Sequence, residues 1–438
     1  MGENKMSLGH NAKIVTDGLV FYYDMKNTKK SWKGKPTTNY AYQQNARIDN
    51  NYENYSSGDA TWDANHPKAI RVYNDNNTEI TGYINRGVNS GNWQVTRHAH
   101  WQFDSELNRP VVVMEDFDAQ WKAKSWNTGK TMTGMGLSYG DTYTISWLQW
   151  TDNIAKSVNA GLYGLNTSGV NYFNDGRTQE KSQTTAFNTK PYTWQRLYVT
   201  FTVSTTWNLA STISCYMYGH YNTRNTIKIA DVQIETGYVS GFSKKETRTN
   251  TESILDMTGN NTITANSLTY NSDGSFEFNG TSGFLGTGVI PADFGMYDSE
   301  YTAIGMINVS DVEGDNMIFG TPTALSREGL HLGIRSNYFY FGHYGADSNT
   351  SGTKLVEIDT WYHVAFVYDG TTQYIYVNGN LEKSTNALSF LGTTEVRIAR
   401  GVSSYTVGNI PIAQIYNRAL TDQEVKQNFN ALRGRYGL

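Results

Sequence analysis

The stretch WYHVAFVYDGTTQYIYVNGN, residues 361–380, decides the fold. Residues 361–368 are a near-continuous run of β-formers that ends at the turn pair Asp369-Gly370, and a second run follows at residues 373–377. The next pair, Asn378-Gly379, supplies the two positive φ angles that a type I′ hairpin requires. The stretch therefore predicts buried antiparallel strands joined by tight turns.

The flanking sequence continues this pattern. Further short strands are predicted at residues 331–334, 338–341 and 396–399, with the spacing that a β-sandwich requires. Aromatic residues reach 13%, with 31 Tyr and 11 Trp among 41 Gly, a mixture typical of short strands and tight turns. One short helix is predicted at the C-terminal end, where Thr421 and Glu424 match a capping box and Val425, Phe429 and Leu432 follow at helical spacing. The predicted fold class is all-β.

Charge and cysteine content exclude several classes of function. Net charge is -4 and only 17% of the 438 residues are charged, so no nucleic-acid partner is expected. No apolar run is long enough to span a membrane, so no membrane partner is expected either. The N-terminal sequence has no apolar signal segment, which predicts synthesis in the cytosol. The single Cys215 excludes disulfides within the chain and any Cys-based metal site.

Several separated motifs resemble one family. Residues 361–379, then Ile415-Tyr416-Asn417-Arg418-Ala419-Leu420-Thr421 and the final helix, resemble the concanavalin A-like, laminin-G-like domains common in tailed-bacteriophage virion proteins. Such a domain opens with a Gly-Leu-Val-Leu-x-Leu-Asp strand and continues with Leu-Asp-Leu-Ser-Gly-Asn. Here the opening strand is at residues 18–24 and its continuation at 254–261. The resemblance implies a discontinuous sandwich of residues 1–35 plus 249–438, interrupted by an inserted domain at 36–248.

The inserted segment has a strand pattern of its own. Polar and apolar residues alternate at 142–150, 194–202 and 227–235, which predicts a second sandwich. These strands, the last of the form Ile-Ala-x-Val-Gln-Ile-Glu-x-Gly, resemble carbohydrate-binding modules of the jelly-roll class found in glycanases and phage fibres. The insert is therefore predicted to be a carbohydrate-binding-module-like jelly roll.

Sugar binding is the chemistry that the residues favour. Sugar recognition needs flat aromatic faces surrounded by polar groups, although most Trp residues of a sandwich are core. In the C-terminal domain, alternation puts Tyr338 and Tyr340 on one face and Phe339 and Phe341 on the other, and the turn that follows is expected to be exposed. The candidate sugar contacts are Trp93, His98, His100, Trp101 and Trp126 in the insert, and His343, Tyr344 and Asp347 in the C-terminal domain.

No catalytic or metal site emerges from the sequence. Glycanases of this fold carry two carboxylates in a Glu-x-Asp-x-x-Glu strand, and in the nearest match, Glu357-Ile358-Asp359, Tyr362 stands where the second Glu is needed. No catalytic residue is assigned and the chain is predicted not to be an enzyme. No cofactor is predicted, but calcium remains possible: Asp311, Glu313 and Asp315 alternate as oxygen ligands do, without the rest of an EF-hand pattern. His98 and His100 lack the further ligands of a zinc site.

The resemblance implies a tail-fibre, head-fibre or surface-decoration protein that presents lectin-like domains to host-surface glycans. Its expected partners are other virion proteins, a host glycan and copies of itself, trimeric by analogy with fibres. Its expected location is the virion surface, after synthesis in the host cytoplasm. Two alternatives stay open, namely a cement protein of capsid or tail without sugar binding, and a polysaccharide depolymerase.

Overall fold

The structure, a computed structural model, describes most of the chain. The α1 helix and the majority of the strands lie in the longer described segments. The described residues are 13–40, 47–48, 72–73, 99–114, 123–154, 159–163, 172–173, 183–184, 188–205, 207–210, 212–218, 226–243, 246–271, 274–345 and 349–438.

Two compact units make up the chain. Unit 1 consists of Met1–Pro36 and Thr249–Leu438, and unit 2 of Thr37–Arg248. The two-stranded pairing of β2 (Thr37–Thr38) with β15 (Thr247–Arg248) brings the first and last residues of unit 2 together. None of the described helices is long and apolar enough to span a membrane.

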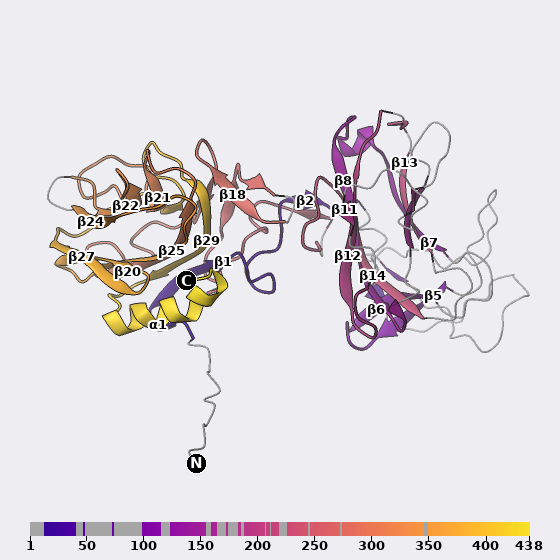
Figure 1. Cartoon of the computed structure of the whole chain (residues 1–438), viewed down its shortest axis with the longest axis horizontal. Helices are drawn as coiled ribbons and strands as arrows, with labels where there is room; N and C mark the ends of the chain where they lie inside the picture. The colour runs from indigo at the N-terminus through magenta and orange to yellow at the C-terminus, as the bar shows by residue number, and fades with distance from the viewer. Residues whose placement is uncertain are drawn as a thin grey trace, which may run out of the picture. The chain divides into compact units, whose positions relative to one another are not determined.

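The first sheet of unit 1 has eight antiparallel strands (Figure 1). Its order is β17-β18-β29-β20-β25-β26-β27, and β1 pairs with β29 beside this path. The strands are β1 (Leu19–Asp24), β17 (Thr269–Tyr270), β18 (Phe276–Asn279), β20 (Tyr301–Val309), β25 (Tyr362–Tyr368), β26 (Thr372–Val377), β27 (Asn380–Asn386) and β29 (Val407–Tyr416).

The second sheet of unit 1 has seven strands in the order β16-β19-β28-β21-β22-β23-β24. One face of this sheet packs against the first sheet. Its strands are β16 (Thr264–Asn266), β19 (Phe284–Gly286), β21 (Asn316–Gly320), β22 (His331–Arg335), β23 (Tyr338–Gly342), β24 (Asn349–Leu355) and β28 (Arg397–Ile398).

The core of unit 1 lies between these two sheets and has the expected alternation. Phe339 and Phe341 of β23 are fully buried in it, together with Phe366 of β25. The β26–β27 hairpin turns at Asn378 and Gly379, with φ angles of 50° and 75°, as a type I′ turn requires. The predicted all-β sandwich with one short C-terminal helix is confirmed.

The N-terminal strand belongs to this same sandwich. β1 pairs antiparallel with β29, and its Phe21 and Tyr23 side chains lie in the core. The segment around residue 256 lies beside it: the Tyr22 N–H donates to Asp256 Oδ1 at 2.9 Å, and the Met257 N–H donates to the Tyr22 carbonyl at 2.7 Å. Two pieces of sequence some 230 residues apart therefore form one continuous structure.

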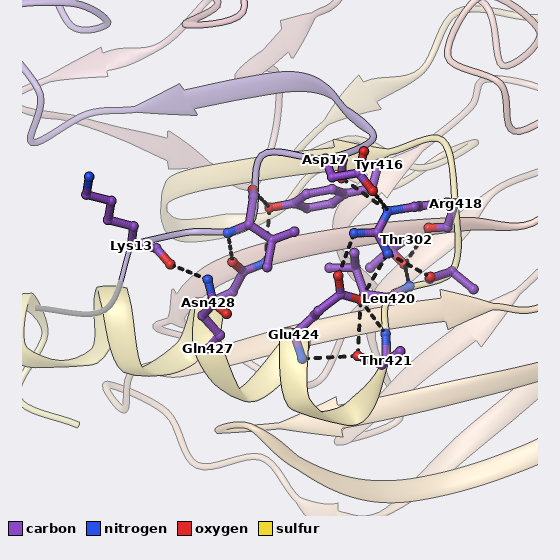
Figure 2. Close-up of polar contacts among 12 residues, drawn as sticks. Lys13, Asp17, Thr302, Tyr416, Arg418, Leu420, Thr421, Glu424, Gln427 and Asn428 are labelled. Atoms are coloured by element: carbon purple, nitrogen blue, oxygen red, sulfur yellow. Dashed lines mark hydrogen bonds and ion pairs between the residues drawn. The ribbon is translucent and has the colours of Figure 1, made fainter.

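The one α-helix among the described residues, α1 (Asp422–Leu432), fastens the N-terminal segment to the first sheet (Figure 2). Its capping box between Thr421 and Glu424 is present as predicted. Asn428, which the helical pattern did not mark, is buried; its Oδ1 accepts from the Val15 N–H at 2.7 Å and its Nδ2 donates to the Tyr416 hydroxyl at 3.0 Å. A short 3₁₀ turn, η4 (Arg433–Arg435), follows and places Arg435 on Asp24 at 2.6 Å.

Unit 2 contains two larger sheets of its own. The three strands predicted from alternation are present as β8, β12 and β14. A core that includes Trp147, Phe201 and Trp207 covers one face of β8. The strand order of the larger sheet is β11-β12-β8-β14-β6-β5, and that of the smaller sheet is β10-β9-β13-β7. A separate pair joins β3 (Arg47–Ile48) to β4 (Val72–Tyr73), and a 3₁₀ turn, η2, spans Thr133–Met135. The strands of the two sheets are β5 (Ala99–Asp104), β6 (Arg109–Met114), β7 (Ala123–Thr131), β8 (Thr142–Thr151), β9 (Asn159–Tyr163), β10 (Tyr172–Phe173), β11 (Gln183–Thr184), β12 (Gln195–Thr202), β13 (Thr212–Tyr218) and β14 (Ile227–Thr236).

Candidate binding face of unit 1

The seven-stranded sheet of unit 1 presents polar and aromatic side chains on the face away from the core. In β22, Leu332 and Ile334 lie in the core, so His331 and Arg335 project from the opposite face. In β23 the same alternation directs Tyr338 and Tyr340 outward. We call this the outer face of the sheet.

Five side chains gather at one place on the outer face. Arg335 lies at the centre, and its neighbours come from the start of β21, from β22, from β23 and from the turn after β23. We call this group the β22–β23 cluster, and its members are Asp315, His331, Arg335, Tyr340 and Tyr344.

Arg335 is held in a fixed orientation. Its Nε and Nη2 donate to the two oxygens of Asp315 at 2.9 and 2.5 Å, a bidentate contact. The hydrogen bond to Asp315 raises the pKa of Arg335 above its usual value. Its guanidinium carbon lies 4.6 Å from the centroid of the Tyr340 ring, within range of a cation–π interaction. The ion pair is only partly exposed, at 31% for Arg335 and 29% for Asp315.

His331 is neutral in this arrangement. Its Nδ1 lies 2.8 Å from Nη2 of Arg335, and since a guanidinium only donates, Nδ1 accepts and the proton is on Nε2. Burial lowers the pKa of His331 to about 4, and the charge of Arg335 lowers it as well. The buried Nε2 has no hydrogen-bond partner among the described residues, so His331 holds one unsatisfied donor beneath the surface.

Tyr344 supplies the exposed aromatic surface of the cluster. Its side chain is 39% exposed, and its ring centroid lies 5.6 Å from that of His331. The backbone of Tyr344 has a positive φ of 32° and its carbonyl accepts from the Arg327 N–H at 2.7 Å. The turn therefore places the ring beside His331.

The other sugar-contact candidates of the C-terminal domain fare differently. The expectation of an exposed His343 is wrong, because the side chain is fully buried; its Nδ1 donates to the Leu388 carbonyl and its Nε2 lies on the Tyr301 hydroxyl, each at 2.7 Å. Burial lowers the pKa of His343 to about 4. Asp347 lies outside the described residues. Tyr344 is thus the one candidate of the three that the structure places on the outer face.

The candidates in unit 2 fall on strands of two different sheets or outside the described residues. Trp93 and His98 lie outside the described residues. His100 and Trp101 belong to β5 and Trp126 to β7, and these strands lie at the ends of two different sheets. The proposal that these residues bind sugar stays a prediction.

The possible calcium ligands do not converge either. Asp315 is taken up by Arg335, while Asp311 and Glu313 are exposed, and Asp311 Oδ1 accepts from the Glu313 N–H at 2.9 Å. Within the described ranges, no group of three or more His, Cys, Asp or Glu side chains is arranged to hold a metal ion. The spacing alone suggested ligands, but the salt bridge from β22 redirects the one at position 315.

Sequence reasoning missed His331 and Arg335 as site residues. The signal was present, because His331-Leu332-Gly333-Ile334-Arg335 alternates and precedes the Ser336-Asn337 turn. Both turn residues have positive φ, at 50° and 69°, so the pair closes a tight hairpin between β22 and β23. A correct strand register for this hairpin would have placed Arg335 opposite Tyr338 and on the same face as Tyr340.

Comparison with known proteins identifies part of the chain. Residues 282–426, less than half of it, match the family model described as the concanavalin A-like lectin/glucanases superfamily. No curated protein sequence matches the chain.

Similar solved structures share low sequence identity with the chain. A sialidase of Trypanosoma rangeli is 16% identical, with a TM-score of 0.34, over 41% of this chain and 31% of the sialidase. Domain 4 of an extracellular arabinanase from Geobacillus stearothermophilus, in complex with arabinotriose, is 18% identical, with a TM-score of 0.31, over 40% of this chain and 91% of that domain. A structure of botulinum neurotoxin type C, described as interacting with two ganglioside molecules, is 17% identical, with a TM-score of 0.31, over 42% of this chain and 50% of the neurotoxin chain. The chain thus spans less than a third of the length of the sialidase.

The prediction that the chain is not an enzyme is wrong, because the missing motif does not exclude enzymatic activity. It rested on the missing Glu-x-Asp-x-x-Glu motif, but the superfamily whose model matches residues 282–426 is described as containing glucanases beside lectins. The fold is therefore shared with glycosidases, and the absence of one motif does not separate the two groups. Residues 282–426 are therefore similar to the concanavalin A-like domains of the lectin/glucanase superfamily.

Proposed function

We propose that unit 1 binds glycans through the β22–β23 cluster on the outer face of its seven-stranded sheet. The observation that carries this proposal is the partly exposed Tyr344 ring, which packs against His331, the neighbour of the bidentate Arg335–Asp315 pair. A sugar ring can stack its apolar side on such an aromatic face. Its hydroxyl groups can donate to the remaining lone pairs of Asp315 and accept from the guanidinium.

The cluster is rigid before a ligand arrives, which favours binding. The ion pair, the cation–π contact with Tyr340 and the hydrogen bond to His331 fix the Arg335 side chain. Little side-chain entropy then remains to be lost when a sugar binds.

A glycan array with matched variants tests the proposal. Replacing Tyr344 by Ala should weaken binding of the recognised glycans about three- to tenfold, because stacking on one aromatic ring contributes about 0.5–1.5 kcal/mol. Arg335→Lys, which keeps the charge but loses the bidentate contact, should weaken binding of the same glycans. Tyr297→Ala is the control, since Tyr297 is a similarly exposed tyrosine of unit 1. Equal binding by the Tyr344 and Tyr297 variants, or no glycan bound at all, would refute the proposal.

The biological setting is a further part of the proposal. We infer that the chain is displayed on the surface of a tailed-phage particle, as a fibre or decoration subunit in trimers that contact host glycans. The support is the resemblance of the motifs at residues 18–24, 361–379 and 415–421 to domains of such virion proteins. An electron-microscopy map of the intact particle tests this placement, because a host-contacting subunit must project from the particle.

A further inference from the structure

A second group of side chains lies on the same outer face, at the β19–β28 side of the sheet. In β19 Leu285 is core and in β28 Ile398 is core, so Phe284 and Arg397 project outward. A tight loop follows β28, in which Arg400 and Tyr405 face each other across an isolated bridge. We call this group the β19–β28 cluster, and its members are Phe284, Glu395, Arg397, Arg400 and Tyr405.

Two guanidinium groups are stacked on aromatic rings in this cluster. The guanidinium carbons of Arg397 and Arg400 lie 5.2 and 4.8 Å from the centroid of the Phe284 ring. Arg400 also lies 4.8 Å from the centroid of the Tyr405 ring. Stacking occupies the faces of a guanidinium and leaves its N–H edge available, and this edge is what binds carboxylate or sulfate oxygens in a bidentate way.

The cluster has two positive charges, on Arg397 and Arg400, and one negative charge, on Glu395. Glu395 is its one carboxylate: its Oε2 accepts from Arg397 Nε at 3.1 Å, while its Oε1 accepts from the Gly288 N–H at 2.8 Å. The guanidinium group of Arg400 forms no hydrogen bond or ion pair with another residue in the described part of the chain. Two like charges held at one phenyl ring repel each other, so a bound anion would relieve a cost that the folded protein already carries.

Both clusters lie along one row across the sheet. Arg397 pairs with Gly320 of β21, and Gly320 pairs with His331 of β22. Neighbouring strands are about 4.8 Å apart, so Arg397 and His331 are separated by roughly 10 Å along the row. A Cβ at position 320 would lie 2.3 Å from the Arg400 carbonyl oxygen, so only glycine fits there and the Arg400–Gly401 backbone covers the middle of the row.

We propose that the β19–β28 cluster binds the carboxylate or sulfate group of an acidic glycan. The inference rests on the proposed function, and it specifies the ligand class: a glycan that stacks on Tyr344 and passes over the Arg400–Gly401 backbone, so that its acidic group lies between Arg397 and Arg400. The β22–β23 cluster binds the neutral part of the ligand, and the β19–β28 cluster binds its charged group.

Binding of three polysaccharides to the full chain tests this inference by biolayer interferometry. The probes are polygalacturonate, which carries carboxylates, dextran sulfate, which carries sulfates, and uncharged dextran. The double variant R397Q/R400Q should lose about tenfold or more in affinity for at least one acidic polymer, since hydrogen bonds to charged groups are the strong ones. R397K/R400K keeps the charge but loses the planar edge, and it should lose affinity as well. Which acidic polymer responds identifies the acidic group.

The control removes two positive charges from elsewhere on unit 1. K383Q/K426Q alters exposed residues of β27 and α1, on the other sheet, and should change the affinity less than twofold. Equal losses in R397Q/R400Q and K383Q/K426Q, or no binding of either acidic polymer, would overturn the inference. The glycan array separates this result from the proposed function: R397Q/R400Q should keep the signals of neutral glycans, which Tyr344→Ala weakens.

Discussion

Replacing Phe21 and Tyr23 together by alanine should unfold unit 1 and leave unit 2 folded. Both side chains are fully buried in the core between the two sheets, and Phe21 packs edge-on against Phe294 with ring centroids 5.8 Å apart. Truncation of a buried aromatic residue costs about 3–5 kcal/mol, so the pair removes most or all of the roughly 5–15 kcal/mol that stabilises a domain. Limited proteolysis followed by mass spectrometry should show loss of residues 249–438 and survival of a fragment from unit 2.

The matched control lies in the core of unit 2. Tyr143 and Phe201 are buried there and stack with ring centroids 5.4 Å apart. Their double replacement by alanine should reverse the pattern, so that unit 2 is cleaved and unit 1 resists. If the Phe21 and Tyr23 variant resisted cleavage at residues 249–438 as well as the unaltered chain does, β1 would not be part of that sandwich.

Acidification from pH 7 to pH 4 should destabilise unit 1 by several kcal/mol. His331, His343 and His363 are buried, and burial lowers the pKa of each to about 4. Above the unfolded value near 6.5 both states are neutral, so the histidines have no effect. As the pH falls from 6.5 to 4, the unfolded chain binds protons that the folded chain does not, and stability falls, by up to about 3 kcal/mol for each histidine. Urea denaturation by pulse proteolysis, at pH 7, 6, 5 and 4.5, measures this slope.

Substitution of one of these histidines isolates its contribution. His363 is fully buried beside Phe429 of α1, with ring centroids 5.6 Å apart, and neither of its ring nitrogens has a hydrogen-bond partner among the described residues. Phenylalanine at this position keeps an aromatic ring that cannot be protonated. H363F should therefore be about 2 kcal/mol more resistant to acid at pH 5, relative to its own stability at pH 7. An unchanged slope would mean that the pKa of His363 is the same in the folded and the unfolded chain, so that its burial does not lower it.

The elements set by local sequence were predictable. Asn378-Gly379 forced its turn because few other residues accept two positive φ angles, and Thr421 with Glu424 fixed the start of α1. The pairing of β1 with β29 could be inferred only from the separated halves of a motif, at residues 18–24 and 254–261, since no local pattern carries that information. Alternation also separated Phe339 and Phe341 from Tyr338 and Tyr340, and the structure shows which of the two faces is the core.

The candidate site was only partly predictable, because its contacts join strands that are distant in sequence. Nothing near Asp315 in the sequence indicates its ion pair with Arg335, twenty residues later, so a calcium ligand was the natural reading. His343 looked like an exposed turn residue, yet the chain folds the Leu388 carbonyl and Phe390 over it. Such burial depends on segments that local periodicity does not see.

The central claim is that glycan contacts lie on the outer face of the seven-stranded sheet of unit 1. Hydrogen–deuterium exchange of the full chain, with and without the strongest oligosaccharide from the array, locates the contact most directly. The predicted result is slower exchange in peptides that cover His331–Tyr344, with no change in peptides from residues 37–248. Protection confined to residues 37–248, where Trp93, Trp101 and Trp126 lie, would contradict the claim and move sugar binding to unit 2.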